Sequence, residues 1–155
     1  MLTPPNRVGS PPRDGEPPMT TLEKPELRGT RVLVVDDDAD NREMLAMILE
    51  LSGALVATAG SVAEALEVLE KERSQVLISD IGLPDEDGYS LLRKVRALPK
   101  AGGGEIPAIA LTGYGGHEDR AQTTAEGFQA HLTKPVALDE MLAAIVRVLQ
   151  SPSDP

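Results

Sequence analysis

The sequence contains no cysteine and no tryptophan, and it has only two tyrosines and one phenylalanine among 155 residues. Without cysteine, a disulfide framework and a thiolate metal or redox site are excluded. No apolar run approaches the roughly 18 residues that a membrane-spanning helix needs, and the N-terminus lacks the apolar segment of a secretory signal. We therefore expect a soluble, cytoplasmic protein with a mostly aliphatic core and no membrane partner.

Positive charge is also scarce. The chain has 15 basic and 25 acidic residues, which gives a formal net charge of -10. Nucleic acids are held largely through their phosphates by Lys and Arg, so this balance argues against direct binding of nucleic acid. The length is sufficient for one domain with a hydrophobic core.

Proline is concentrated at one end of the chain. Seven of the 13 prolines lie in residues 1–28, where large apolar side chains are few. Such a segment cannot bury enough apolar surface to offset the entropy lost on ordering. We predict a disordered tail or linker over residues 1–28, a folded domain over residues 29–150 and a frayed tail over residues 151–155.

Short apolar runs alternate with amphipathic segments through the folded region. The predicted strands are residues 31–35, 54–59, 76–80, 107–112 and 130–134, and the predicted helices are residues 40–52, 89–98, 118–126, 138–149 and a segment that begins at residue 61. Strands that alternate with helices indicate an α/β fold with a parallel sheet and helices on both faces. Five such units predict a flavodoxin-like (βα)5 domain with strand order 2-1-3-4-5.

Three of the predicted helices carry an apolar face at helical spacing. In the helix that begins at residue 61, Ala65, Leu66 and Leu69 are expected to face inward. In the first helix the residues expected to face the core are Leu45, Ile48 and Leu49. In the last helix they are Leu142, Ile145, Val146 and Leu149.

Polar side chains stand where the predicted strands end. Asp36 and Asp37 follow the first strand, Asp80 ends the third, Thr112 ends the fourth and Lys134 ends the fifth. Parallel strands deliver their carboxyl ends to one edge of the sheet, and the strand order reverses between the first and third strands. Asp36, Asp37 and Asp80 are therefore expected to lie close together, with Thr112 and Lys134 at the same edge of the sheet.

This set of residues favours a particular chemistry. Carboxylates crowded in one cleft repel each other, and Mg²⁺ relieves that repulsion because it takes oxygen ligands. Lys134 adds a second cation. A carboxylate held beside a metal, a hydroxyl and an ammonium is suited to attack on a phosphoryl group.

The order and spacing of several short motifs resemble those of a known family, the receiver domains of two-component response regulators such as the chemotaxis regulators. The resemblance covers about residues 30–150 and rests on Val35-Asp36-Asp37, Ser79-Asp80, Leu83-Pro84-Asp85, Asp87-Gly88, Leu111-Thr112-Gly113 and Lys134-Pro135. It implies a regulatory phosphorelay domain rather than an enzyme. Asp80 would accept a phosphoryl group from phosphohistidine on a histidine kinase or a histidine phosphotransfer protein.

The resemblance also implies roles for the neighbouring residues. Asp37, Asp80 and the Gly82 carbonyl would ligate Mg²⁺, with Asp36 acting through water. Thr112 would bond the phosphoryl group and Lys134 would pair with it, next to a cis peptide bond before Pro135. Phosphorylation would switch an interaction face made by the fourth helix, the fifth strand and the fifth helix, which is also a possible dimer interface. The segments 111–114 and 132–135 further resemble receivers attached to hybrid histidine kinases.

One position departs from the family pattern. Three residues before the lysine the family usually has Tyr or Phe, and here the residue is His131. We hypothesise that His131 performs the same switching role or senses pH. Tyr114, two residues after Thr112, is a candidate shield of the phosphoryl group. Asp85, Glu86 and Asp87 are interpreted as loop solvation and turn residues.

Two other functions remain open from the sequence. A small phosphatase of the haloacid-dehalogenase type would use Asp36 as nucleophile and Asp38 as acid and base. That family needs acidic metal ligands after the lysine, and the only acidic pair there, Asp139-Glu140, opens a predicted helix instead. A degenerate receiver that serves only for docking is the third reading, against which the complete acidic set argues.

Overall fold

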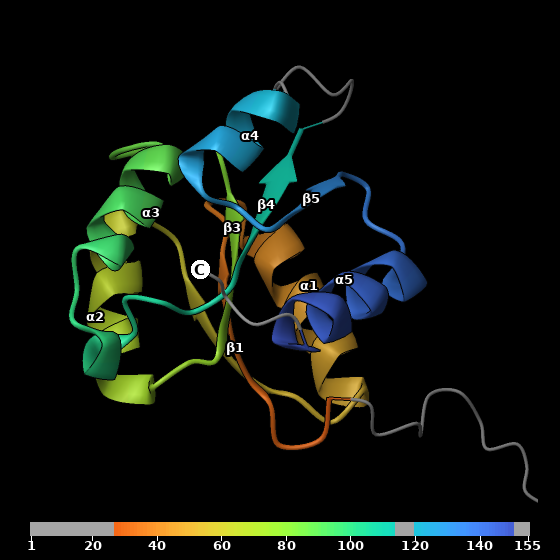
Figure 1. Cartoon of the computed structure of the whole chain (residues 1–155). Coiled ribbons are helices and arrows are strands. Elements are labelled where there is room, and N and C mark those ends of the chain that lie inside the picture. The colour runs from red at the N-terminus through yellow and green to blue at the C-terminus, as the bar shows by residue number, and fades with distance from the viewer. Residues whose placement is uncertain (1–26, 114–119, 151–155) are drawn as a thin grey trace, which may run out of the picture.

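The computed structural model describes residues 27–113 and 120–150, and all structural statements below concern these residues. They form a central sheet with helices on both sides (Figure 1). The strands are β1 (Arg31–Val35), β2 (Leu55–Ala59), β3 (Val76–Asp80), β4 (Ala108–Thr112) and β5 (Ala130–Thr133). The helices are α1 (Ala39–Leu51), α2 (Val62–Glu72), α3 (Gly88–Arg96), α4 (Arg120–Glu126), α5 (Leu138–Gln150) and the short 3-10 helix η2 (Lys100–Gly102).

The sheet has the order β2-β1-β3-β4-β5, and every neighbouring pair of strands is parallel. The predicted flavodoxin-like topology is therefore confirmed. β3 and β4 are buried along their whole length, as expected for strands covered on both faces. β2 is an edge strand and is more exposed.

Each face of the sheet has its own aliphatic core. Leu45 and Leu49 of α1 pack with α5 against Val34 and Ile78 on one face. Leu69 of α2 packs with residues of α3 on the other face, and Figure 1 shows the two pairs of helices on opposite sides of the sheet. None of the helices in the described residues has the length and apolar character needed to cross a membrane.

The inward face of α5 differs from the prediction. Ile145 is fully buried and Leu142 and Val146 are partly buried, but Leu149 is 37% exposed. The residues that the periodicity missed are Met141, Ala144 and Val148. α5 is apolar around most of its circumference, so spacing alone did not identify the side that meets the sheet. In α1 the buried positions Leu45 and Leu49 are as expected, and Ile48 is partly buried.

The folded part also includes Leu27, which lies before the predicted start of the domain at residue 29. Its side chain is fully buried, and its amide donates to the Ser52 carbonyl. Most of the predicted tail, residues 1–26, lies outside the described residues, as does residue 118, at which the fourth helix was expected to begin. The described part of α4 begins at Arg120.

Helix caps set the loops that lead away from the carboxyl ends of the strands. Asp38 caps α1 by accepting hydrogen bonds from the amides of Asp40 and Asn41. Ser61 caps α2 by accepting from the Glu64 amide, and Asp87 caps α3 by accepting from the Ser90 amide. Side-chain oxygens at these positions satisfy amides that have no partner within the helix, so the loops around the site are fixed locally.

Candidate phosphoryl-acceptor site

Asp36 lies directly after β1 and is fully buried. Its Oδ1 accepts from the Asp38 amide at 2.9 Å, and its Oδ2 accepts from Asn41 Nδ2 at 2.5 Å. Arg42 Nη1 donates to the Asp36 carbonyl at 2.7 Å. Asn41, in the first turn of α1, therefore holds the Asp36 carboxylate, and Arg42 holds the Asp36 backbone carbonyl; the sequence analysis missed both roles.

Asp80 ends β3, next to β1, and is 9% exposed. Lys134 Nζ reaches both acidic strand ends, at 2.9 Å from Asp80 Oδ2 and 3.0 Å from Asp36 Oδ2. The Gly82 amide donates to Asp80 Oδ1 at 3.2 Å. Three residues from three different strand ends thus meet, as the strand order predicts. The Lys134-Pro135 peptide bond is cis, as the family resemblance implies.

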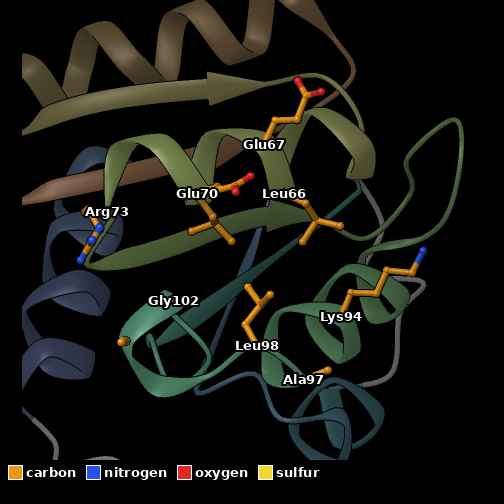
Figure 2. Close-up of a pocket in the computed structure, with 10 residues that line it drawn as sticks. Leu66, Glu67, Glu70, Arg73, Lys94, Ala97, Leu98 and Gly102 are labelled. Atoms are coloured by element: carbon orange, nitrogen blue, oxygen red, sulfur yellow. The ribbon is translucent and has the colours of Figure 1, made fainter.

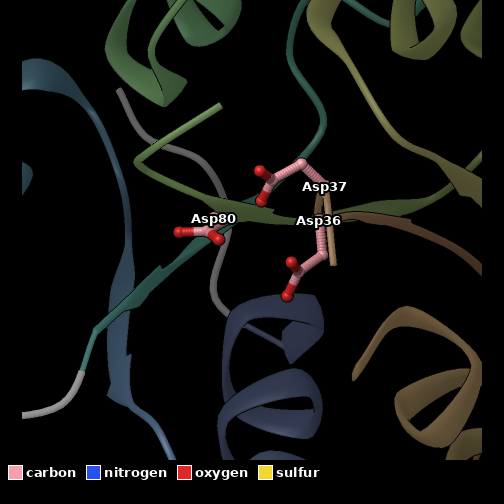
Figure 3. A group of neighbouring side chains, drawn as sticks. All are labelled: Asp36, Asp37 and Asp80. Carbon is pink, nitrogen blue, oxygen red and sulfur yellow. The ribbon is translucent and has the colours of Figure 1, made fainter. Parts of the chain in front are cut away.

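A third carboxylate completes the acidic group. Carboxylate oxygens of Asp36, Asp37 and Asp80 all lie within 4.8 Å of one another, and Figure 3 shows Asp36 and Asp37 at the end of β1 beside Asp80. Asp37 is exposed, so the group opens to solvent. A group of carboxylate oxygens that is buried on one side and open to solvent on the other fits a hard divalent cation that keeps part of its water shell. Within the described residues this is the one group of acidic or histidine side chains with metal-binding spacing.

The charges of the site are unbalanced without a further cation. Burial raises the pKa of Asp80, and the nearby Asp36 carboxylate adds to that increase, while the Lys134 ammonium opposes it. For Lys134, burial alone would lower the pKa, but its hydrogen bonds to Asp80 and Asp36 outweigh burial and raise the pKa. One ammonium therefore pairs with two of the three carboxylates, and a bound divalent cation would offset the remaining negative charge.

Thr112 and His131 lie on the far side of the site, on β4 and β5. Thr112 is fully buried, and its Oγ1 lies 3.1 Å from His131 Nε2 and 3.5 Å from the Leu132 carbonyl oxygen. The Lys134 amide donates to the Thr112 carbonyl at 3.0 Å, so the backbone joins the ends of β4 and β5. The structure thus places Thr112 at the predicted edge, with its hydroxyl bonded to His131. Tyr114, the predicted shield, lies outside the described residues.

Two features fix the position of the loop that follows β3. Asp85 accepts from the amides of Val62 and Ala63, at 3.0 and 3.1 Å, in the first turn of α2. The interpretation of Asp85 as a loop and turn residue is incomplete: it is exposed and accepts from the Glu86 amide, but it also bridges to α2, and the hydrogen bonds from α2 lower its pKa. Gly88 is needed for close approach, because a Cβ there would lie 2.6 Å from the Asp80 carbonyl oxygen.

A separate hollow of about 710 Å³ lies between α2 and α3. Leu66 and Leu98 face it from opposite sides, and Glu67, Glu70 and Lys94 stand around it (Figure 2). It shares no residue with the acidic site. A second hollow, of about 580 Å³, runs beside β5 and is lined by residues of α4, β5 and α5, including His131.

Comparison with known proteins agrees with this geometry. Residues 32–146 match the family model of the response regulator receiver domain, which covers most of the chain. The chain belongs to this receiver family. It is a regulatory signalling domain of two-component systems, and the haloacid-dehalogenase alternative is not favoured: Asp139 and Glu140 sit in the first turn of α5 and are not part of the acidic group.

Related sequences include proteins of different lengths. The receiver domain is 46% identical over 114 residues to the "uncharacterized 14.6 kDa protein in sodA1 3'region" of Leptolyngbya boryana, covering 74% of this chain and 86% of that protein. It is 34% identical over 120 residues to the virulence transcriptional regulatory protein PhoP of Salmonella typhimurium, covering 77% of this chain and 52% of PhoP. The chain thus spans about half of PhoP, and it covers 24% of the regulator DctD of Rhizobium meliloti.

Solved structures show the same receiver fold. A putative response regulator from Chloroflexus aurantiacus superposes with a TM-score of 0.71 at 32% identity, over 80% of this chain and all of that one. The receiver domain of the sensor histidine kinase PA1611 from Pseudomonas aeruginosa has a TM-score of 0.71 at 29% identity, over 79% of this chain and 99% of that one. That neighbour has a magnesium ion coordinated in its active-site cleft.

Proposed function

We propose that this receiver domain takes a phosphoryl group from phosphohistidine onto Asp80, with Mg²⁺ bound by the acidic group, and that the modified site changes a protein-interaction face. The observation that carries the proposal is the meeting of Asp36, Asp37 and Asp80 within 4.8 Å around an opening to solvent, with Lys134 bonded to two of them. This is the arrangement that a carboxylate nucleophile for phosphoryl transfer needs.

The transfer is a substitution at phosphorus. A carboxylate oxygen of Asp80 forms a bond to the phosphorus atom while the bond from phosphorus to the donor imidazole nitrogen breaks, and the electron pair of that bond returns to the imidazole. The products are an acyl phosphate on Asp80 and a free histidine on the donor. Water later attacks the same phosphorus, the bond from phosphorus to the Asp80 oxygen breaks, and inorganic phosphate leaves. The carboxylate is thereby restored, so the modification is temporary.

The residues of the site have different proposed roles. Asp36, Asp37, Asp80 and the Gly82 carbonyl are proposed to hold Mg²⁺, with Asp36 acting through water. When bound, Mg²⁺ neutralises charge on the phosphoryl oxygens. Lys134 is already oriented by Asp80 and Asp36 and supplies a second positive charge at the same place.

Thr112 is proposed to donate its hydroxyl proton to a phosphoryl oxygen. That movement would alter the neighbouring surface of α4, β5 and α5, because β4 and β5 are paired in register at Thr112 and Thr133. New negative charge that recruits a nearby donor is a common way for phosphorylation to bias a local equilibrium. The same face is the proposed interface for an effector or for a second receiver.

The proposed donor is a histidine kinase or a histidine phosphotransfer protein. Met44 and Met47 on α1 are 47% and 59% exposed, and α1 begins directly at the acidic group. Large exposed apolar side chains on a helix that begins at a reaction site indicate a docking surface for a protein donor. We propose that the donor packs on this part of α1 when its phosphohistidine reaches Asp80.

Labelling tests the chemistry. The protein is incubated with Mg²⁺ and a small acyl-phosphate donor, and the modified peptide is identified by mass spectrometry. We expect one phosphoryl group on Asp80 and no labelling of Asp80→Asn, while Asp139→Asn, a change on the exposed start of α5, is labelled like the wild type. Modification of Asp36 instead would support the phosphatase reading, and no modification of the intact site would support a degenerate docking domain.

Docking is tested with a phosphohistidine protein as donor. Met44→Glu and Met47→Glu should slow transfer from the protein donor about tenfold or more, because they place charge in an apolar contact, and should leave labelling by the small donor unchanged. Leu55→Glu is the matched control. Leu55 is 55% exposed, but it lies at the start of β2, whereas the acidic group lies where the strands end. Equal transfer rates for all three variants would rule out the α1 surface.

A further inference from the structure

A continuous chain of hydrogen bonds leads from Thr112 to α4 through His131. His131 Nε2 lies 3.1 Å from Thr112 Oγ1, and His131 Nδ1 lies 3.1 Å from Thr123 Oγ1. Thr123 is 1% exposed and Thr112 is fully buried, so both ring nitrogens face hydroxyls that are shielded from water. His131 departs from the family pattern in the sequence, but nothing in the sequence pattern pointed to Thr123.

The directions of these hydrogen bonds follow from a further contact. Thr123 Oγ1 donates its single proton to the Arg120 carbonyl, at 2.9 Å. At its contact with His131 the Thr123 oxygen can therefore only accept, so Nδ1 must carry a proton. A neutral imidazole has one donor and one acceptor nitrogen, which makes Nε2 the acceptor. The hydroxyl proton of Thr112 then points to His131, because its other acceptor, the Leu132 carbonyl, is 3.5 Å away.

We infer that Thr123 is a positioning residue: it selects the Nδ1–H form of His131, and this form directs the Thr112 hydroxyl proton toward the ring instead of toward the phosphoryl site. The inference rests on the proposed role of Thr112 in binding the phosphoryl group. It assigns a function to a buried residue of α4 that touches neither the phosphoryl group nor the metal.

This arrangement makes phosphorylation compete with an existing hydrogen bond. Thr112 has one proton, so it cannot donate to a phosphoryl oxygen and to His131 Nε2 at once. When Thr112 turns to the phosphoryl group, His131 Nε2 loses its hydrogen bond from Thr112, and the surroundings of the ring change. Because the other ring nitrogen is bonded to Thr123, this change acts on α4 directly. The resting state is thereby stabilised, and the change at β4 is passed to α4 by one side chain.

The form of the His131 ring is measurable in the unmodified protein by NMR of the ring nitrogens. We expect the Nδ1–H form in the wild type and in Thr123→Ser, which keeps the hydroxyl. In Thr123→Val, which has nearly the same shape without a hydroxyl, we expect a change toward the Nε2–H form. Thr124→Val is the matched control, since Thr124 is the next residue of α4 and is exposed. It should resemble the wild type.

A second measurement connects the ring to the site. With Mg²⁺ present, beryllofluoride serves as a phosphoryl analogue whose affinity can be titrated. In Thr123→Val the Nε2–H group would donate to Thr112 and leave its proton available, so we expect about fivefold tighter binding, the effect of one hydrogen bond. Thr123→Ser and Thr124→Val should bind the analogue like the wild type.

The outcomes separate the two proposals. A wild-type ring in the Nε2–H form, or a ring and an affinity that do not respond to Thr123→Val, would overturn the role of Thr123 while leaving phosphorylation of Asp80 intact. Failure of Asp80 to be labelled would overturn the proposed function, whatever form the ring adopts. If Thr123→Val does not fold, the Nε2–H form in the wild type would still overturn the inference, and the Nδ1–H form in both the wild type and Thr123→Ser would support it.

Discussion

The carboxyl edge of the sheet has two halves with different physics. At β1 and β3 the contacts are between full charges: Asp36 and Asp80 share the ammonium of Lys134, whose side chain reaches them from the end of β5. At β4 and β5 the contacts are between neutral groups, with Thr112 bonded to His131. Ionic contacts of this kind change substantially only when charge is added or removed, whereas a hydroxyl can turn at the cost of about one hydrogen bond. The charged half is therefore suited to the reaction and the neutral half to reporting it.

The largest effect is expected when one side chain is removed from each half and the rates of labelling are compared. Lys134→Met is expected to slow labelling of Asp80 by a small acyl-phosphate donor about 100-fold, because the phosphoryl oxygens lose a positioned cation. Thr112→Val should slow it only about tenfold, since it removes one hydrogen bond. Lys94→Met is the control: Lys94 is an exposed lysine on α3 bonded to Glu86. Equal losses for Lys134→Met and Thr112→Val would contradict the division into two halves.

The next largest effect should come from the backbone that carries the charged half. A Cβ at residue 88 would lie 2.6 Å from the Asp80 carbonyl oxygen and 2.9 Å from Ile81 Cα. Gly88→Ala must therefore displace the end of β3, at a cost of about 2 kcal/mol in the free energy of unfolding. Gly102→Ala, where the nearest atom would be at an ordinary 3.6 Å, is the comparison. Denaturant unfolding measures the free energy of unfolding of both variants. If Gly88→Ala were as stable as the wild type and labelled normally, the loop after β3 would accommodate a Cβ more easily than these distances indicate.

Asp80 itself should destabilise the fold when no metal is present. Its pKa is raised, mainly by burial, so the carboxyl contributes stability when protonated and loses it as the pH rises from about 4 through the raised pKa. With a chelator at neutral pH, Asp80→Asn is therefore expected to be more stable than the wild type by about 1 kcal/mol. The difference should disappear below about pH 4.

Mg²⁺ provides the control for this comparison. Added Mg²⁺ should raise the melting temperature of the wild type and have less effect on Asp80→Asn, because the variant lacks one of the acidic ligands. A wild-type protein that is already the more stable of the two in chelator would argue against the crowding of charge on which the metal site depends.

The smallest effect is expected outside both halves, where Asp85 bridges to α2. Asp85→Ala removes the acceptor of the Val62 and Ala63 amides. We expect faster hydrogen exchange at these two amides with little change elsewhere. The pKa of Asp85 is lowered, so the bridge should persist above its ordinary pKa and weaken as the pH falls through the lowered value. Unchanged exchange at both amides would show that the helix start does not need the bridge.

The charged half was predictable from the sequence and the neutral half largely was not. Asp36, Asp80 and Lys134 each end an apolar run, and parallel strands must bring such ends together. Thr123 lies within α4, the least apolar of the predicted helices, and only the packing of that helix shows that this threonine is buried beside His131. A helix with a weak pattern gives no sign of which side faces inward.

The same reasoning explains the other differences. Asp85 is one of three acidic residues in a loop, and nothing in the local sequence shows that it reaches the start of α2. Leu149 is apolar at the expected spacing but lies toward solvent, because α5 meets the sheet along Met141, Ile145 and Val148. Local patterns thus located the elements well, whereas contacts between elements required the three-dimensional structure.

The burial of Leu27 has a practical consequence for handling the protein. A shortened version that starts at residue 29, the expected domain boundary, would delete a core side chain and the hydrogen bond to Ser52. Leu27 precedes β1, at the opposite end of that strand from Asp36. A fluorophore or a surface linker attached before Leu27 would therefore leave the end of the sheet that carries Asp36 and Asp80 open to approaching donors.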